Sequence, residues 1–99
     1  MEAKIREEMF NLGILSNKKG YIYIIGAVKR FNSSITMEEI YNNIASTVGK
    51  SRCAVEGSIR TAIKSANHDL SAWKNYDCLT TREFITTMYY RTREESANE

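Results

Sequence analysis

The chain has 99 residues, of which 42% are hydrophobic and 26% charged, the size and composition of one folded domain. Its formal net charge of +2 does not by itself indicate a nucleic-acid partner. No apolar run approaches the ~20 residues of a membrane span, and the first residues lack the apolar segment of a secretory signal. We therefore expect a cytoplasmic protein without a membrane partner.

The number and spacing of the cysteine and histidine residues limit which metal or catalytic sites the chain can form. The two cysteines and the single histidine, Cys53, Cys78 and His68, are too few and too scattered for a structural zinc site. A Cys–His nucleophile pair is formally open to them, but a small buried thiol and a solvated imidazole are the commoner use of such residues. Phosphate-loop, metalloprotease and serine-hydrolase motifs are absent from the sequence. We expect no catalysis, no metal and no cofactor.

The first third of the chain predicts two helices. Ile5, Met9 and Leu12 recur at helical spacing, and Gly13 predicts a left-handed stop. Ser16 and Asn17 can cap a second helix, whose apolar stripe is formed by Tyr21, Ile24, Ile25, Val28 and Phe31. Residues 32–34, Asn-Ser-Ser, predict a turn.

The middle of the chain predicts a third and a fourth helix. Thr36 and Glu39 have the spacing of a capping box, and Gly49 predicts the end of the third helix. The apolar side of this helix consists of Met37, Ile40, Ile44 and Val48. The fourth helix begins within residues 51–53, with Ser51 as the better cap, and stops at residues 67–69. Its apolar stripe consists of Val55, Ile59, Ala62, Ile63 and Ala66.

The last third predicts a final helix, preceded by a short helical stretch. Residues 70–79 favour a helical turn or two, and Thr80 and Glu83 form a second capping box. The inward residues of the last helix are Phe84, Ile85, Met88 and Tyr89, and residues 94–99 should fray. The sequence thus predicts an all-α fold of five to six short helices, with residues 1–99 as one domain.

The connection between the third and fourth helices has the length of a helix-turn-helix turn, about three residues centred on Gly49. Ala45 stands four residues earlier, where crossing helices need a small side chain, and Ile44, Val48 and Val55 supply apolar contacts. Lys50 is polar where such motifs often have an apolar residue. A helix-turn-helix over about residues 37–66 is indicated, although any antiparallel helix pair shows part of this pattern.

The outer face of the fourth helix carries charges four residues apart. They are Arg52, Glu56, Arg60 and Lys64, expected opposite Val55, Ile59 and Ile63, with Ser51, Ser58 and Thr61 as short donors nearby. A helix in the major groove reads base edges from its first two turns, and arginine to guanine is the commonest specific contact. The alternative is a solvated face stabilised by Arg52–Glu56 and Glu56–Arg60 ion pairs.

The charge along the chain is polarised. Residues 49–75 hold five bases against two acids, and residues 1–30 hold six against three, whereas residues 76–99 hold three against five. Lys18 and Lys19 stand at the start of the second helix, where the macrodipole disfavours cations. A phosphate bound at that helix terminus would offset the conflict. The alternative is that these lysines are solvated and have no role, which is the commoner case.

Several runs resemble one family. They are Lys19-Gly20-Tyr21-Ile22-Tyr23-Ile24 followed by Ala27-Val28, then Ile44-Ala45, Val55-Glu56, Ile59-Arg60-Thr61-Ala62-Ile63-Lys64, and Glu83-Phe84-Ile85 with Met88. In this order they are similar to the DNA-binding effector domain of the stage-zero sporulation protein A family, the regulator of sporulation initiation. The resemblance covers about residues 5–95, with short deletions before Ile35 and between Trp73 and Thr80.

The resemblance implies a bacterial, six-helix DNA-binding domain of the winged-helix-like superfamily, without an evident wing in this sequence. The fourth helix, about residues 52–66, would enter the major groove of double-stranded DNA at the nucleoid. Two copies would sit head-to-tail as a homodimer on tandem sites, with RNA polymerase as a further candidate partner. The family reads bases with arginines and a glutamate early in this helix. Glu56 and Arg60 match such positions, whereas Ala54 and Gly57 stand where the family has arginine, and Arg52 substitutes in part.

Two functions follow from these patterns. The first is a sequence-specific DNA-binding transcriptional regulator, whose contact residues are Lys18, Lys19, Lys50, Ser51, Arg52, Glu56, Gly57, Arg60 and Lys64. The second is a helical protein–protein interaction module that has kept the fold and lost DNA binding, with Tyr23, Tyr41 and Tyr90 as an exposed partner patch. A mid-helix Gly57 fits a decaying reader and equally fits a close approach to a phosphate or base.

Overall fold

The computed structural model describes residues 2–14, 16, 19–32, 34–66 and 80–97. Within this part of the chain it contains five helices and no strand, so the expected all-α fold is confirmed. The helices are α1 (Glu2–Asn11), α2 (Lys19–Arg30), α3 (Met37–Val48), α4 (Arg52–Lys64) and α5 (Thr81–Ala97).

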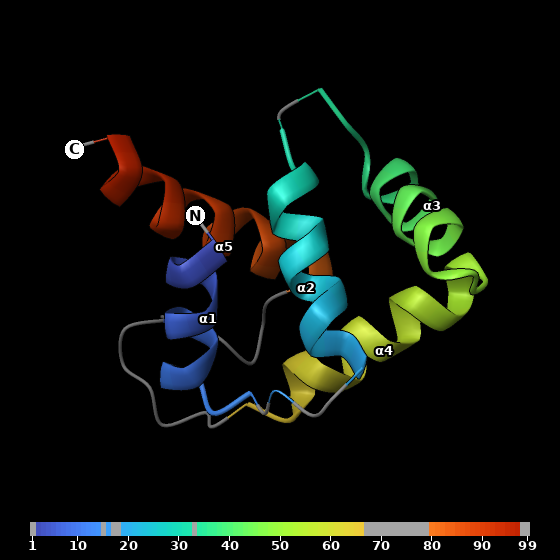
Figure 1. Ribbon diagram of the computed structural model, residues 1–99, viewed down its shortest axis with the longest axis horizontal. Helices are drawn as coiled ribbons and strands as arrows, with labels where there is room; N and C mark the ends of the chain where they lie inside the picture. The colour runs from blue at the N-terminus through green and yellow to red at the C-terminus, as the bar shows by residue number, and fades with distance from the viewer. Residues whose placement is uncertain (1, 15, 17–18, 33, 67–79, 98–99) are drawn as a thin grey trace.

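Helix α2 occupies the middle of the fold and packs against each of the other four helices (Figure 1). Helices α1 and α5 lie together on one side of it, α3 lies on the other, and α4 crosses its N-terminal end. Arg91 of α5 joins α1 through an ion pair of 2.7 Å to Glu8. The buried apolar side chains of all five helices form one cluster, to which the predicted stripes of α2 and α4 contribute every one of their residues.

The helix ends follow the predicted capping chemistry. Gly13 has φ of +77°, and the Ile14 amide beyond it donates to the Met9 carbonyl at 2.9 Å, which closes α1. Thr36 Oγ1 accepts from the Glu39 amide at 3.1 Å. At the start of α5 both halves of a capping box form, since Thr80 Oγ1 accepts from the Glu83 amide and the Thr80 amide donates to Glu83 Oε1.

Several expected boundaries differ from the structure. Helix α4 ends at Lys64 with Ser65 as its C-cap, two residues before the expected end, because the Ser65 hydroxyl donates to the Ala62 carbonyl. Helix α5 continues to Ala97, beyond the residue at which fraying was expected. The predicted cap at Asn17, the stop at residues 67–69 and the turns over 70–79 lie outside the described residues.

Two side chains of α3 contradict the predicted apolar pattern. Val48 is 37% exposed, because it is the last residue of the helix, where the chain turns away at Gly49. Tyr41, predicted to be an exposed partner residue, is only 6% exposed. The buried face of α3 is therefore wider than a four-residue repeat predicts, since it includes Tyr41 and Ala45 beside Ile40 and Ile44. None of the described helices combines the length and apolar character that crossing a membrane requires.

Candidate nucleic-acid interface

A three-residue turn joins α3 to α4 as the sequence predicts. Gly49 has φ of +71°, a left-handed conformation, and its amide donates to the Ala45 carbonyl at 2.9 Å. The Lys50 amide donates to the same carbonyl at 3.1 Å. Ser51 then caps α4, because its hydroxyl oxygen accepts from the Ala54 amide at 3.1 Å. Both helix ends are thus fixed within three residues, which sets the direction in which α4 leaves the turn.

The buried residues of α4 determine which of its faces meets solvent. Val55 and Ile59 are fully buried, and at 100° per residue Gly57 stands opposite their mean direction. The charged stripe of Arg52, Glu56, Arg60 and Lys64 starts on the flank toward α3, with Arg52 only about 40° from the buried direction, and approaches the middle of the exposed face only at Lys64. The expectation that the whole stripe stands opposite the buried residues is therefore wrong, because a four-residue spacing drifts by 40° per turn.

Ion pairs divide the cations of this surface into two groups. Arg60 Nη2 lies 2.7 Å from Glu56 Oε1, as predicted for an i, i+4 pair. Arg52 Nη1 lies 2.9 Å from Glu38 Oε1 at the start of α3, so the predicted Arg52–Glu56 pair is wrong. The reason is that Arg52, on the flank, faces α3. Three exposed lysines, Lys19, Lys50 and Lys64, form no ion pair with any other described residue.

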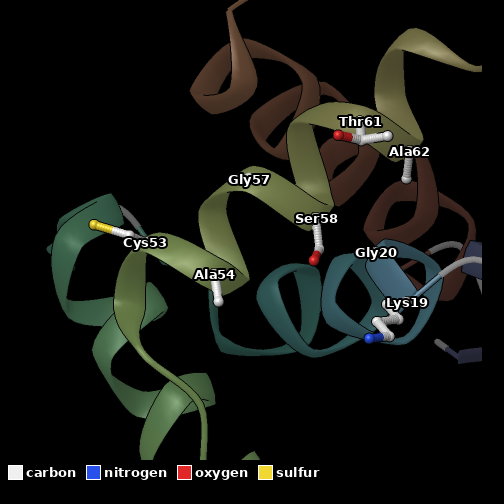
Figure 2. Close-up of a pocket in the computed structure, with 8 residues that line it drawn as sticks. All are labelled: Lys19, Gly20, Cys53, Ala54, Gly57, Ser58, Thr61 and Ala62. Carbon is white, nitrogen blue, oxygen red and sulfur yellow. The ribbon is translucent and has the colours of Figure 1, made fainter.

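A hollow of about 490 Å³ runs between α4 and the start of α2. Ala54 and Ser58 point from α4 toward the first turn of α2 (Figure 2). The hollow is lined by Lys19, Gly20, Cys53, Ala54, Gly57, Ser58, Thr61 and Ala62. A Cβ atom added at Gly57 would meet nothing within 4 Å, so the middle of the α4 face is open.

Gly20 explains why α2 lies so close to α4. A Cβ atom at Gly20 would overlap the Ser58 carbonyl oxygen and lie 2.7 Å from Ala62 Cβ, so only glycine permits this crossing. The crossing brings Lys19, the preceding residue, to the rim of the hollow. Lys19 and the cations of α4 therefore belong to one surface, although they are far apart in the sequence.

The remaining predicted residues have different outcomes. Lys18, Cys78 and His68 lie outside the described residues. Cys53 is exposed at the start of α4, so the expected buried thiol is wrong there. Among the described residues no group of three potential metal ligands is brought together.

Tyr41 lies beneath the charged flank of the surface. Burial, and secondarily the Glu56 carboxylate, raises the pKa of the Tyr41 phenol. Tyr23, the second predicted patch residue, packs partly buried against the core, whereas Tyr90 is 43% exposed. The predicted three-tyrosine patch therefore does not form.

Sequence reasoning missed two parts of the surface. The first is Glu38, because nothing in the spacing of the sequence shows that Arg52 reaches it. The hollow beside Gly57 was missed as well, because it depends on how α2 crosses α4. The small residues Ser58 and Ala62, which stand four apart on α4, were a signal of that close crossing.

Comparison with protein families identifies the chain. Residues 5–99 match the family described as the C terminal of sporulation initiation factor Spo0A. The match spans nearly the whole sequence, and the chain belongs to this family. It is a family of DNA-binding transcriptional activator domains and is not enzymatic. No curated protein and no solved structure gives a significant match.

Proposed function

We propose that this member of the Spo0A C-terminal family is a sequence-specific regulator of transcription that places α4 in the major groove of double-stranded DNA. The observation that supports this most directly is the exposed face of α4, which no described part of the chain covers. Cations flank that face from two helices, and its middle is open at Gly57. An α-helix with such a face fits the width of the major groove.

We assign the cations two roles. Arg52 and Arg60, on the flank of α4, would contact base edges, since the arginine fork matches the O6 and N7 atoms of guanine. Lys19, Lys50 and Lys64 would contact phosphates, because an unpaired lysine is a compact charge without directional preference. The Ser51 hydroxyl, which accepts from Ala54, still has its own proton to donate to a phosphate. Gly57 would let the backbone of α4 approach the bases.

The finer parts of the proposal come from the family. Residues 1–99 would act as one helical domain in the bacterial cytoplasm, bound to the nucleoid. Two copies would bind head-to-tail on tandem sites and contact RNA polymerase. Lys19 is the first residue of α2 and Lys18 precedes it in the sequence. A phosphate at the helix terminus would offset the unfavourable position of such charges.

A salt titration of binding tests the central claim. A random-sequence duplex offers the arginines no preferred base, so all five cations, Lys19, Lys50, Arg52, Arg60 and Lys64, would contact phosphates there. Log K should then fall against log salt with a slope of about −4 to −5. Lys19→Ala should make this slope shallower by about 0.9. Lys29→Ala, at the opposite end of the same helix, is the matched control and should leave it unchanged.

Sequence specificity is tested separately from affinity. Arg60→Ala should lose about 1–3 kcal/mol of discrimination at a particular base pair, whereas Lys64→Ala should weaken binding to all sequences alike. A folded protein that binds no duplex even at low salt would refute the proposal and favour the interaction module instead.

A further inference from the structure

Both arginines of the α4 surface form an ion pair with a carboxylate, whereas, within the described part of the chain, its lysines do not. Each guanidinium is held by a carboxylate, Arg60 by Glu56 at 2.7 Å within α4, and Arg52 by Glu38 at 2.9 Å across the turn. The lysines of the surface have no such partner among the described residues. A surface that binds a polyanion thus keeps two carboxylates, each beside an arginine.

Neither folding stability nor DNA affinity accounts for the contact between Glu38 and Arg52. Its side chain is 67% exposed and that of Arg52 is 44% exposed, and exposed ion pairs contribute little to stability. A negative charge near the phosphates lowers DNA affinity in general. The macrodipole favours an acid anywhere in the first turn of α3, so it explains the charge of Glu38 but not its contact with Arg52.

We propose, on the basis of the function inferred above, that Glu38 is a positioning residue for sequence recognition, acting through Arg52. The pair fixes one end of the guanidinium against α3, at the first residue of the recognition helix. A guanidinium has five N–H donors, and the pair uses Nη1. The other donors remain for a base edge, so Glu38 selects which base pair Arg52 faces.

Binding should strengthen this effect. In the free protein water competes for both charges, whereas the major groove around a bound helix excludes part of that water. The attraction between Glu38 and Arg52 increases as the local dielectric constant falls. Glu56 and Arg60 form a second carboxylate–guanidinium pair further along α4. Both arginines would therefore enter the groove with their guanidinium groups already oriented. The lysines, which have no ion-pair partner among the described residues, would be free to contact phosphates of any sequence.

Selection from a random-sequence duplex library tests the role of Glu38. The proteins compared are the wild type, Glu38→Gln, Arg52→Ala and the double variant, with Glu39→Gln as the matched control that removes one charge from the same helical turn. Arg52→Ala should abolish the base preference at one base pair. Glu38→Gln should reduce the preference at that same base pair about fivefold and leave the others intact, as coupled neighbours do.

Affinity for random DNA provides the second readout. Both Glu38→Gln and Glu39→Gln should bind random duplex more tightly than the wild type, since each removes a repulsive charge, but only Glu38→Gln should lose base preference. In the double variant, Glu38→Gln should add nothing to the loss caused by Arg52→Ala. An unchanged profile for Glu38→Gln, or a loss at a different base pair, would overturn the proposal while the DNA-binding function stands. A wild type that selects no sequence would overturn both.

Discussion

The crossing of α2 over α4 yields the most direct test of the structure, through the substitution Gly20→Ala. The added Cβ atom would overlap the Ser58 carbonyl oxygen and lie 2.7 Å from Ala62 Cβ. These are backbone and Cβ atoms of a helix, which cannot rotate away, so the two helices must separate. Overpacking of this kind costs about 1–3 kcal/mol, against a gain of at most ~1 kcal/mol from replacing a helical glycine.

The net effect should be a loss of about 1–2 kcal/mol, which for a domain of this size lowers Tm by roughly 4–16 °C. Gly57→Ala is the matched control, since it is the same substitution on the partner helix. Its Cβ atom meets nothing within 4 Å, so only the helix propensity changes and the protein should gain about 0.5–1 kcal/mol. Thermal and urea unfolding followed by circular dichroism measure both. If Gly20→Ala were as stable as the wild type, α2 and α4 would not cross as closely as described.

Two further predictions follow from the described contacts. Glu83→Gln should lower the urea midpoint at neutral pH but not in acid. The hydrogen bond from the Thr80 amide lowers the pKa of the Glu83 carboxyl group in the folded protein. The stabilisation by this carboxylate is therefore complete above the ordinary carboxyl pKa and is lost as the pH falls through the lowered pKa of the folded state. A difference from the wild type that is the same at both pH values would contradict this assignment. In Gly57→Ala, affinity for duplex DNA measured by fluorescence anisotropy should fall while thermal stability rises, because the methyl group occupies the open middle of the α4 face. Unchanged affinity would mean that DNA does not approach the backbone at Gly57.

The features that the sequence predicted well are those encoded by neighbouring residues. Gly49 requires a left-handed conformation that glycine adopts without strain, and Ser51 has a side chain that accepts from the amide three residues on. Such caps depend on a few consecutive residues. The buried stripe of α4, Val55 to Ile63, was predictable for a similar reason, since a helix on the surface of a domain buries one continuous side.

The features that were missed depend on residues far apart in the chain. Helical spacing offers Arg52 a partner at Glu56, but the structure pairs it with Glu38, on a different helix. Likewise, Tyr41 is a residue type that often lies exposed at partner surfaces, but here it is buried because the domain covers that side of α3. Periodicity fixes which residues share a face of one helix. It does not specify which other helix covers that face.

The proposed DNA surface is a product of packing rather than of α4 alone. Lys19 reaches the hollow only because Gly20 allows the first turn of α2 to touch α4 at Ser58. Any change that separates these helices therefore moves Lys19, a proposed phosphate contact, as well as weakening the core. In Gly20→Ala, the salt dependence of DNA binding should become shallower even at temperatures where the protein is fully folded, toward that of Lys19→Ala. A destabilised Gly20→Ala protein that kept the wild-type slope would separate the two roles and place Lys19 outside the DNA contact.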